Sequence, residues 1–306
     1  MNASTSPPRI TSEKFTLVSF AWGLALLISD LPDVIWNAVT GEIPDWLFWG
    51  KVGVLITGCA LSLAWKRLRP LWQFTIVMLV FYLALAFTSF IRNGDWWQSR
   101  FGGENVSFGV GFLGIFLLDT FVALTVLLTL WLIFRKRSAF FLVKGQLDAP
   151  IEPVRWLGIG KGESWHTFGW IFAICAMVIV AIPTILSLRP SGEVLLNAAS
   201  FLPIVVLCAA INAFNEESYF RLSMLSTLTD IIGKTHALLI TIVFFGLSHW
   251  LYGSPPALLG FMLTGFLAFL MGKSILETKG LFWAWLIHFL PDVAVFASYA
   301  IAWFQE

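Results

Sequence analysis

The chain has 306 residues, of which 58% are hydrophobic and only 12% are charged, and its mean hydropathy is +0.83. Ordinary soluble domains carry about 25% charged residues, so this composition excludes an ordinary soluble globular protein. The net charge of +1 gives no reason to expect a nucleic-acid partner. The sequence therefore predicts an all-α, polytopic transmembrane helical bundle.

Apolar stretches long enough to cross about 30 Å of hydrocarbon as helices recur along the whole chain. We expect about nine spans, at residues 15–39, 46–65, 71–91, 107–134, 165–187, 194–229, 235–252, 256–273 and 280–303. With the N-terminus in the cytoplasm, fourteen of the nineteen Lys and Arg residues fall inside, including Arg9, while four fall outside and Arg221 lies within a span. The positive-inside rule therefore predicts a cytoplasmic N-terminus.

A hydrophilic stretch divides the spans into two groups. Residues 1–134 hold four spans, residues 135–164 form a mixed, Gly- and Pro-containing segment, and residues 165–306 hold five spans. We expect the middle segment to be a cytoplasmic connector near the membrane surface.

Charge within the spans of the first group is sparse. Asp30 and Asp33 flank Pro32 in the first span, and Asp119 lies in the fourth. The two residues of the first span are consistent either with a kink whose carboxylates reach headgroup water or with a proton or cation site.

The sixth span contains the densest group of charges, in the sequence Asn215-Glu216-Glu217-Ser218-Tyr219-Phe220-Arg221. One charged side chain at bilayer depth costs about 2.5–3.5 kcal/mol on insertion scales. Glu217 and Arg221 have the i, i+4 spacing of a helical ion pair. Glu216 points about 100° away from Glu217 on an α-helix. This pattern favours Glu216 as the reacting group and Glu217–Arg221 as its support, with the exchanged roles of the two glutamates as the alternative.

Two later spans carry histidines at a compatible depth. His249 follows Phe245 in the seventh span, and His288 precedes Asp292 by four residues in the ninth. At 1.5 Å per residue, Glu216 and His249 lie about 20 Å, and His288 about 12 Å, from the expected cytoplasmic ends of their helices. Because polar groups in hydrocarbon need partners, we expect these side chains to share one site.

The three motifs, E-E-x-x-x-R, F-x-x-x-H and H-x-x-x-D, resemble those of the CPBP family of type II CAAX prenyl endopeptidases and their bacterial relatives. The matching residues are Glu216, Glu217, Arg221, Phe245, His249, His288 and Asp292. The resemblance covers about residues 164–302 and implies an intramembrane endopeptidase. It implies that Glu216 and His249 activate water, while His288 and residue 292 stabilise the oxyanion.

The chain departs from the commoner family pattern at Asp292, where most members have Asn. An ionised aspartate cannot donate a hydrogen bond to an oxyanion. Asp292 is therefore protonated, binds a cation or orients His288. The set of Glu216, His249, His288 and Asp292 also suits a Zn²⁺ site with an open water position, so both a metallopeptidase and a glutamate peptidase are open.

We therefore expect a peptidase in the plasma or inner membrane of a bacterium, acting on a membrane-tethered peptide or a lipidated protein, without a nucleotide or organic cofactor. Two alternatives use the same residues. One is a transporter coupled to protons or cations, and the other is a catalytically inactive membrane scaffold or immunity protein.

Overall fold

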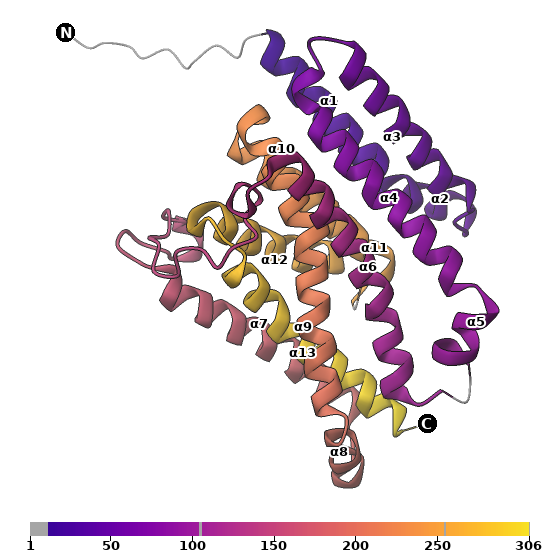
Figure 1. Cartoon of the computed structure of the whole chain (residues 1–306). Coiled ribbons are helices and arrows are strands. Elements are labelled where there is room, and N and C mark those ends of the chain that lie inside the picture. Colours follow the sequence, from indigo (N-terminus) through magenta and orange to yellow (C-terminus); the bar gives the residue numbers. More distant parts are fainter. Residues whose placement is uncertain (1–11, 104–105, 254, 306) are drawn as a thin grey trace.

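The structure is a computed structural model that describes residues 12–103, 106–253 and 255–305. These residues form helices, turns and two isolated β-bridges, without a β-strand. The predicted all-α class is confirmed, and Figure 1 shows the helices gathered in one bundle. The predicted cytoplasmic position of the N-terminus stays a prediction, and Arg9 lies outside the described residues.

The N-terminal helices correspond to the first four predicted spans. They are α1 (Ser12–Ile28), α2 (Leu31–Thr40), α3 (Trp46–Ala64), α4 (Trp72–Arg92), the short α5 (Asp95–Trp97) and α6 (Phe108–Phe134), with a 3₁₀ turn at Arg69–Leu71 and a π-helical turn at Gln98–Gly102.

The remaining helices correspond to the last five predicted spans. They are α7 (Trp165–Leu188), α8 (Gly192–Ala199), α9 (Leu202–Glu216), α10 (Ser223–Ile232), α11 (Lys234–Tyr252), α12 (Ala257–Thr278) and α13 (Phe282–Trp303), with a π-helical turn at Glu217–Leu222 between α9 and α10.

Seven helices in the described part of the chain are long and apolar enough to span a membrane, and two bent pairs bring the number to as many as nine. The predicted span 15–39 is bent by 46° between α1 and α2, and the predicted span 194–229 by 63° between α8 and the helix that follows. Pro32 and Pro203 lie at the start of the helix after each bend, where a residue without an N–H donor is tolerated. The protein is therefore an integral membrane protein.

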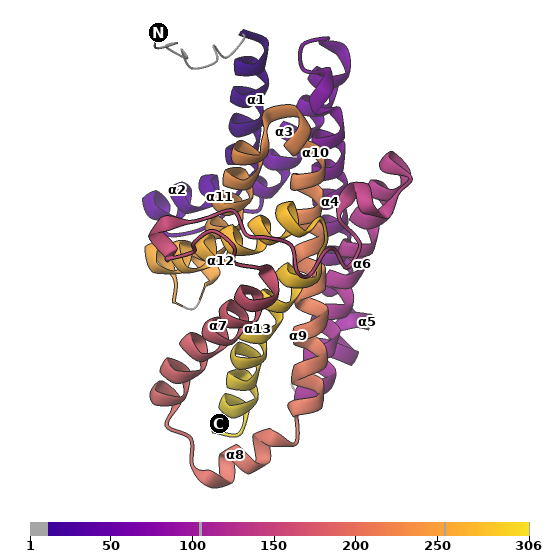
Figure 2. The ribbon, with the colours of Figure 1, turned by 90° about the vertical axis from the view of Figure 1, so that its left-hand side faces the viewer.

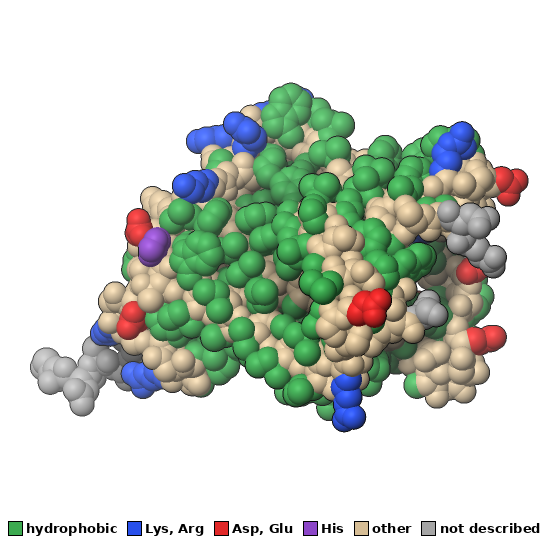
Figure 3. All heavy atoms as spheres, turned by 90° about the horizontal axis from the view of Figure 1, so that it is seen from below, with side chains coloured by type: hydrophobic (Ala, Val, Ile, Leu, Met, Phe, Trp, Pro, Cys, Tyr) green, Lys and Arg blue, Asp and Glu red, His purple; other side chains and the backbone are tan. Residues whose placement is uncertain are grey.

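The surface agrees with this conclusion. Figure 3 shows one face on which hydrophobic side chains are widespread and charged side chains are few. Only 11% of the apolar stretch of α7 is buried within the protein. α7 packs on α13, beside which it lies in Figure 2. Most of α7 therefore lies exposed on the outside of the helical bundle.

The charges of the first span have a partner on the third helix. Lys51 of α3 donates to Asp33 and lies 3.0 Å from Asp30. Lys51 and Asp33 are both buried. Lys51 therefore neutralises charge at the α1–α2 bend.

The two groups of spans share one hydrophobic core. Phe81 of α4 stacks on Tyr219 at a centroid separation of 5.1 Å. Trp22 of α1 donates from Nε1 to Nδ1 of His236 in α11 at 3.2 Å. Packing thus crosses the predicted boundary, and the division into residues 1–134, 135–164 and 165–306 stays a prediction.

The segment between α6 and α7 is folded against the second group of helices. It contains 3₁₀ turns at Arg137–Phe140 and Arg155–Leu157. Its Leu147 carbonyl accepts a hydrogen bond from Trp283 Nε1 at 3.1 Å, and its Gln146 N–H donates to the Thr278 carbonyl at 2.8 Å. The segment is therefore held on α12 and α13.

Candidate active site

The π-helical turn at Glu217–Leu222 lies in the middle of the charged sequence. Such turns close hydrogen bonds from i to i+5 and occur often at functional sites. The helix continues into α10 after the turn. The regular α-helix assumed for Glu216 and Glu217 is therefore wrong in detail, because each residue of a wider turn rotates the chain by less than 100°.

The predicted ion pair between Glu217 and Arg221 is present. Arg221 Nη1 lies 3.1 Å from Glu217 Oε1, and both side chains are completely buried. The guanidinium also lies over the ring of Phe245, with Cζ 3.7 Å from the ring centroid. Phe245 thus gives the buried cation a cation–π partner from another helix.

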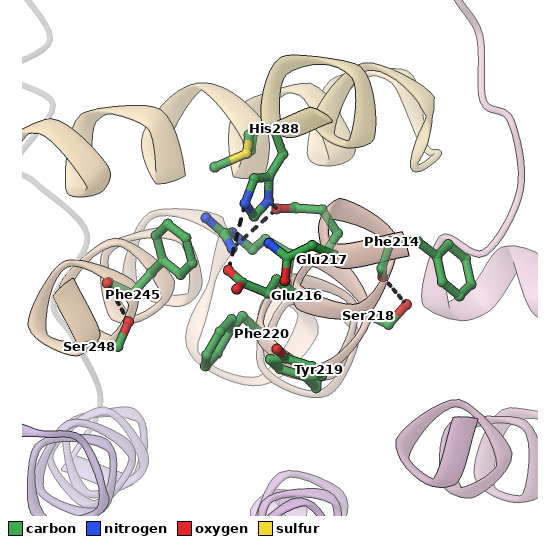
Figure 4. A network of polar contacts seen from close by, with 12 residues as sticks. Phe214, Glu216, Glu217, Ser218, Tyr219, Phe220, Phe245, Ser248 and His288 are labelled. Carbon is green, nitrogen blue, oxygen red and sulfur yellow. Dashed lines mark hydrogen bonds and ion pairs between the residues drawn. The ribbon is translucent and has the colours of Figure 1, made fainter. Parts of the chain in front are cut away.

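His288 joins the two helices that carry most of the charge. Its Nδ1 lies 2.8 Å from Glu217 Oε1, and its Nε2 lies 3.6 Å from both Glu216 Oε2 and Asp292 Oδ2. Figure 4 shows the imidazole of His288 facing the two glutamates. Glu217 therefore contacts His288 as well as Arg221, which the prediction of a purely supporting ion pair did not include.

Asp292 has a partner that the sequence reasoning missed. Asn212 Nδ2 donates to Asp292 Oδ2 at 2.9 Å, the same oxygen that faces His288. Asn212 precedes Glu216 by four residues, so both lie on one side of α9. Asn212 is a polar residue in an apolar run, one helical turn before Glu216. This spacing could have identified it as part of the site.

His249 enters the site from α11. Its Nδ1 lies 2.9 Å from the Phe245 carbonyl oxygen and 3.1 Å from Ser248 Oγ. The Phe245 ring lies 4.5 Å from the His249 ring and 5.8 Å from the His288 ring, between centroids. Phe245 is thus packed against both histidines, and the three predicted motifs meet in space.

The first group of spans supports the charged helix from behind. Asn215 is buried and donates to Thr120 Oγ1 of α6 at 3.0 Å. Asp119, the neighbour of Thr120, lies 3.4 Å from Arg92. The Glu216 side chain is 20% exposed, whereas that of Glu217 is completely buried. Glu216 is therefore the more accessible of the two glutamates.

The predicted metal ligands lie in one cluster. Within the described part of the chain, no three His, Cys, Asp or Glu side chains are placed so that together they could hold a metal ion. Nδ1 of His288 faces Glu217 and Nδ1 of His249 faces the Phe245 carbonyl, so Nε2 is the nitrogen of each ring that could bind a metal ion. Zinc binding stays a prediction, to be tested by metal analysis of the purified protein.

The fold and this cluster together define a membrane protein with a carboxylate–histidine centre. Residues 198–294 match the family model for type II CAAX prenyl endopeptidases of the Rce1-like kind. This match to part of the chain confirms the resemblance predicted from the three motifs. All seven predicted site residues fall within the matched part, whereas α1–α6 lie outside. Neither a curated protein nor a solved structure matches the chain.

Proposed function

We propose that the protein is an intramembrane endopeptidase that hydrolyses a peptide bond in a membrane-tethered peptide or lipidated protein. The observation that carries this proposal is the placement of His288 against Glu216, Glu217 and Asp292, with His249 and Phe245 beside them. The family match supports the reaction class.

Glu216 and His249 are proposed to activate the attacking water. A carbonyl oxygen can only accept a hydrogen bond, so the contact with Phe245 requires a proton on Nδ1 of His249. In the neutral ring this leaves a lone pair on Nε2, which can accept a hydrogen bond from the water and orient it. Glu216 then removes one proton as the oxygen attacks the scissile carbonyl carbon.

The tetrahedral intermediate would be stabilised by His288. Its Nδ1 is held by Glu217, so Nε2 is the nitrogen available to donate to the oxyanion when the ring carries both protons. Donors of this kind contribute about 3–4 kcal/mol of barrier reduction. The carbonyl re-forms as the C–N bond breaks, and Glu216 returns its proton to the leaving nitrogen.

The contacts of Asp292 favour an orienting role over direct donation. Its Oδ2 accepts from Asn212 and faces Nε2 of His288. A carboxylate in this position can fix the imidazole ring without touching the substrate. We therefore assign Asp292 as a positioning residue, the third of the three roles that its sequence position left open.

The test uses purified full-length protein in liposomes with membrane-tethered peptides, prenylated and unprenylated, and locates cleavage by product mass. Glu216→Gln should lower turnover about 10²–10⁴-fold, the usual contribution of a general base. Unchanged turnover in this variant would contradict the proposal.

Asp119→Asn is the matched control, because it removes a carboxylate from a neighbouring span that we assign no part in the chemistry. It should keep turnover near that of the unsubstituted protein. If the unsubstituted protein cleaves none of the peptides while Glu216→Gln still supports its cellular role, a scaffold function replaces the endopeptidase.

A further inference from the structure

A surface groove outside the proposed active site lies where the segment after α6 meets α9 and α13. Its volume is about 440 Å³, within the usual range for ligand pockets. The rings of Phe214, Phe282 and Trp285 form much of its apolar wall, and Arg137 and Lys144 complete it. The groove is therefore apolar along its walls and cationic in its polar part.

The charge of the groove is uncompensated. Arg137 and Lys144 are exposed, and neither makes an ion pair or side-chain hydrogen bond with another residue in the described part of the chain. Among the described residues that line the groove, none is acidic. Basic pockets at the ends of membrane spans suit anionic lipid headgroups.

The backbone holds the cationic side of the groove in place. Leu281 N–H donates to the Val143 carbonyl at 2.9 Å, and Gln146 N–H donates to the Thr278 carbonyl at 2.8 Å. Gly145 between them has φ +82° and packs directly on the backbone of Gly280, where a side chain would collide. These two backbone hydrogen bonds flank Lys144 and hold its segment against the turn that precedes α13.

We propose that this groove binds one anionic phospholipid, with the phosphate between Arg137 and Lys144 and an acyl chain along Phe214, Phe282 and Trp285. Charge complementarity selects an anionic over a zwitterionic headgroup. The acyl chain would pack on α9 and α13, two of the helices that carry the catalytic cluster, and Trp285 already links these two by donating from Nε1 to the Ala210 carbonyl at 3.0 Å.

The test titrates the purified full-length protein in detergent with phosphatidylglycerol or phosphatidylcholine and counts bound lipid by native mass spectrometry. Each Lys or Arg near a membrane surface contributes about 1 kcal/mol, so two cations correspond to about 30-fold in affinity. The double variant Arg137→Ala/Lys144→Ala should lose about that factor for phosphatidylglycerol and leave phosphatidylcholine binding unchanged.

Two further variants separate the groove from general effects of charge and folding. Lys66→Ala/Arg67→Ala removes two exposed cations from another loop and should keep phosphatidylglycerol affinity. Leu142→Trp should fill the groove and weaken binding although every cation remains. Equal affinity of the unsubstituted protein for both lipids, or full phosphatidylglycerol affinity in Arg137→Ala/Lys144→Ala, would overturn the proposal.

Discussion

At the residue scale, His288 is the centre of the candidate site because three carboxylates converge on it. Glu217 holds Nδ1 at 2.8 Å, while Glu216 and Asp292 lie 3.6 Å from Nε2. Asp292 accepts a hydrogen bond from the side-chain amide of Asn212 at 2.9 Å. The acceptor at position 292 therefore has a matching donor at position 212.

This pairing predicts that the two residues can be exchanged. Asn212→Asp alone places two carboxylates face to face, and turnover should fall about 10–100-fold, as is usual when a supporting contact of a site is lost. The exchange Asn212→Asp/Asp292→Asn restores one donor and one acceptor and should recover most of that loss. Steady-state kinetics on membrane-tethered peptides measures both effects.

A double variant no more active than Asn212→Asp would show that the Asn212–Asp292 hydrogen bond does not position the site. Asn212→Leu serves as the control for volume, because it removes the donor without adding charge.

At the element scale, the lengths of the hydrophobic runs determine where the helices begin and end. Polar contacts of particular side chains determine irregularities within a helix. The predicted span 280–303 corresponds to α13 (Phe282–Trp303), and 235–252 corresponds to α11 (Lys234–Tyr252). Apolar runs fix such boundaries because backbone groups in hydrocarbon must be hydrogen-bonded within the segment. The π-helical turn at Glu217–Leu222 depends on tertiary partners of its side chains, so hydrophobic pattern alone could not predict it.

The bend between α1 and α2 gives a stability prediction. Lys51 is the cation that contacts both Asp30 and Asp33, and breaking a buried ion pair from one side typically costs about 3–5 kcal/mol. Lys51→Met should lower the free energy of unfolding by about this amount. Equilibrium unfolding in mixed micelles measures it.

Lys66→Met is the control for that experiment, since it removes an exposed cation with similar side-chain volume. Equal stability of Lys51→Met and the unsubstituted protein would mean that the two aspartates do not need Lys51, and that the bend is held by apolar packing alone.

At the scale of the whole molecule, the bundle brings together groups that are far apart in sequence. Glu216 on α9, His249 on α11 and His288 on α13 were expected to meet because their depths were compatible, and the structure gathers them. The support from α6, where Thr120 accepts from Asn215, could not be predicted, because nothing in the sequence specifies which apolar helix packs behind another. The groove between Lys144 and Trp285 also depends on that packing.

The central claim is that Glu216 and His249, held by different helices, act on the same water molecule. The most direct measurement compares peptide-bond hydrolysis by Glu216→Gln, His249→Ala and the double variant, because residues that act as a unit are not additive. We predict that each single change lowers turnover about 10²–10⁴-fold and that the double variant is no slower than the slower single one. Losses that multiply in the double variant, or turnover unaffected by either single change, would contradict this account.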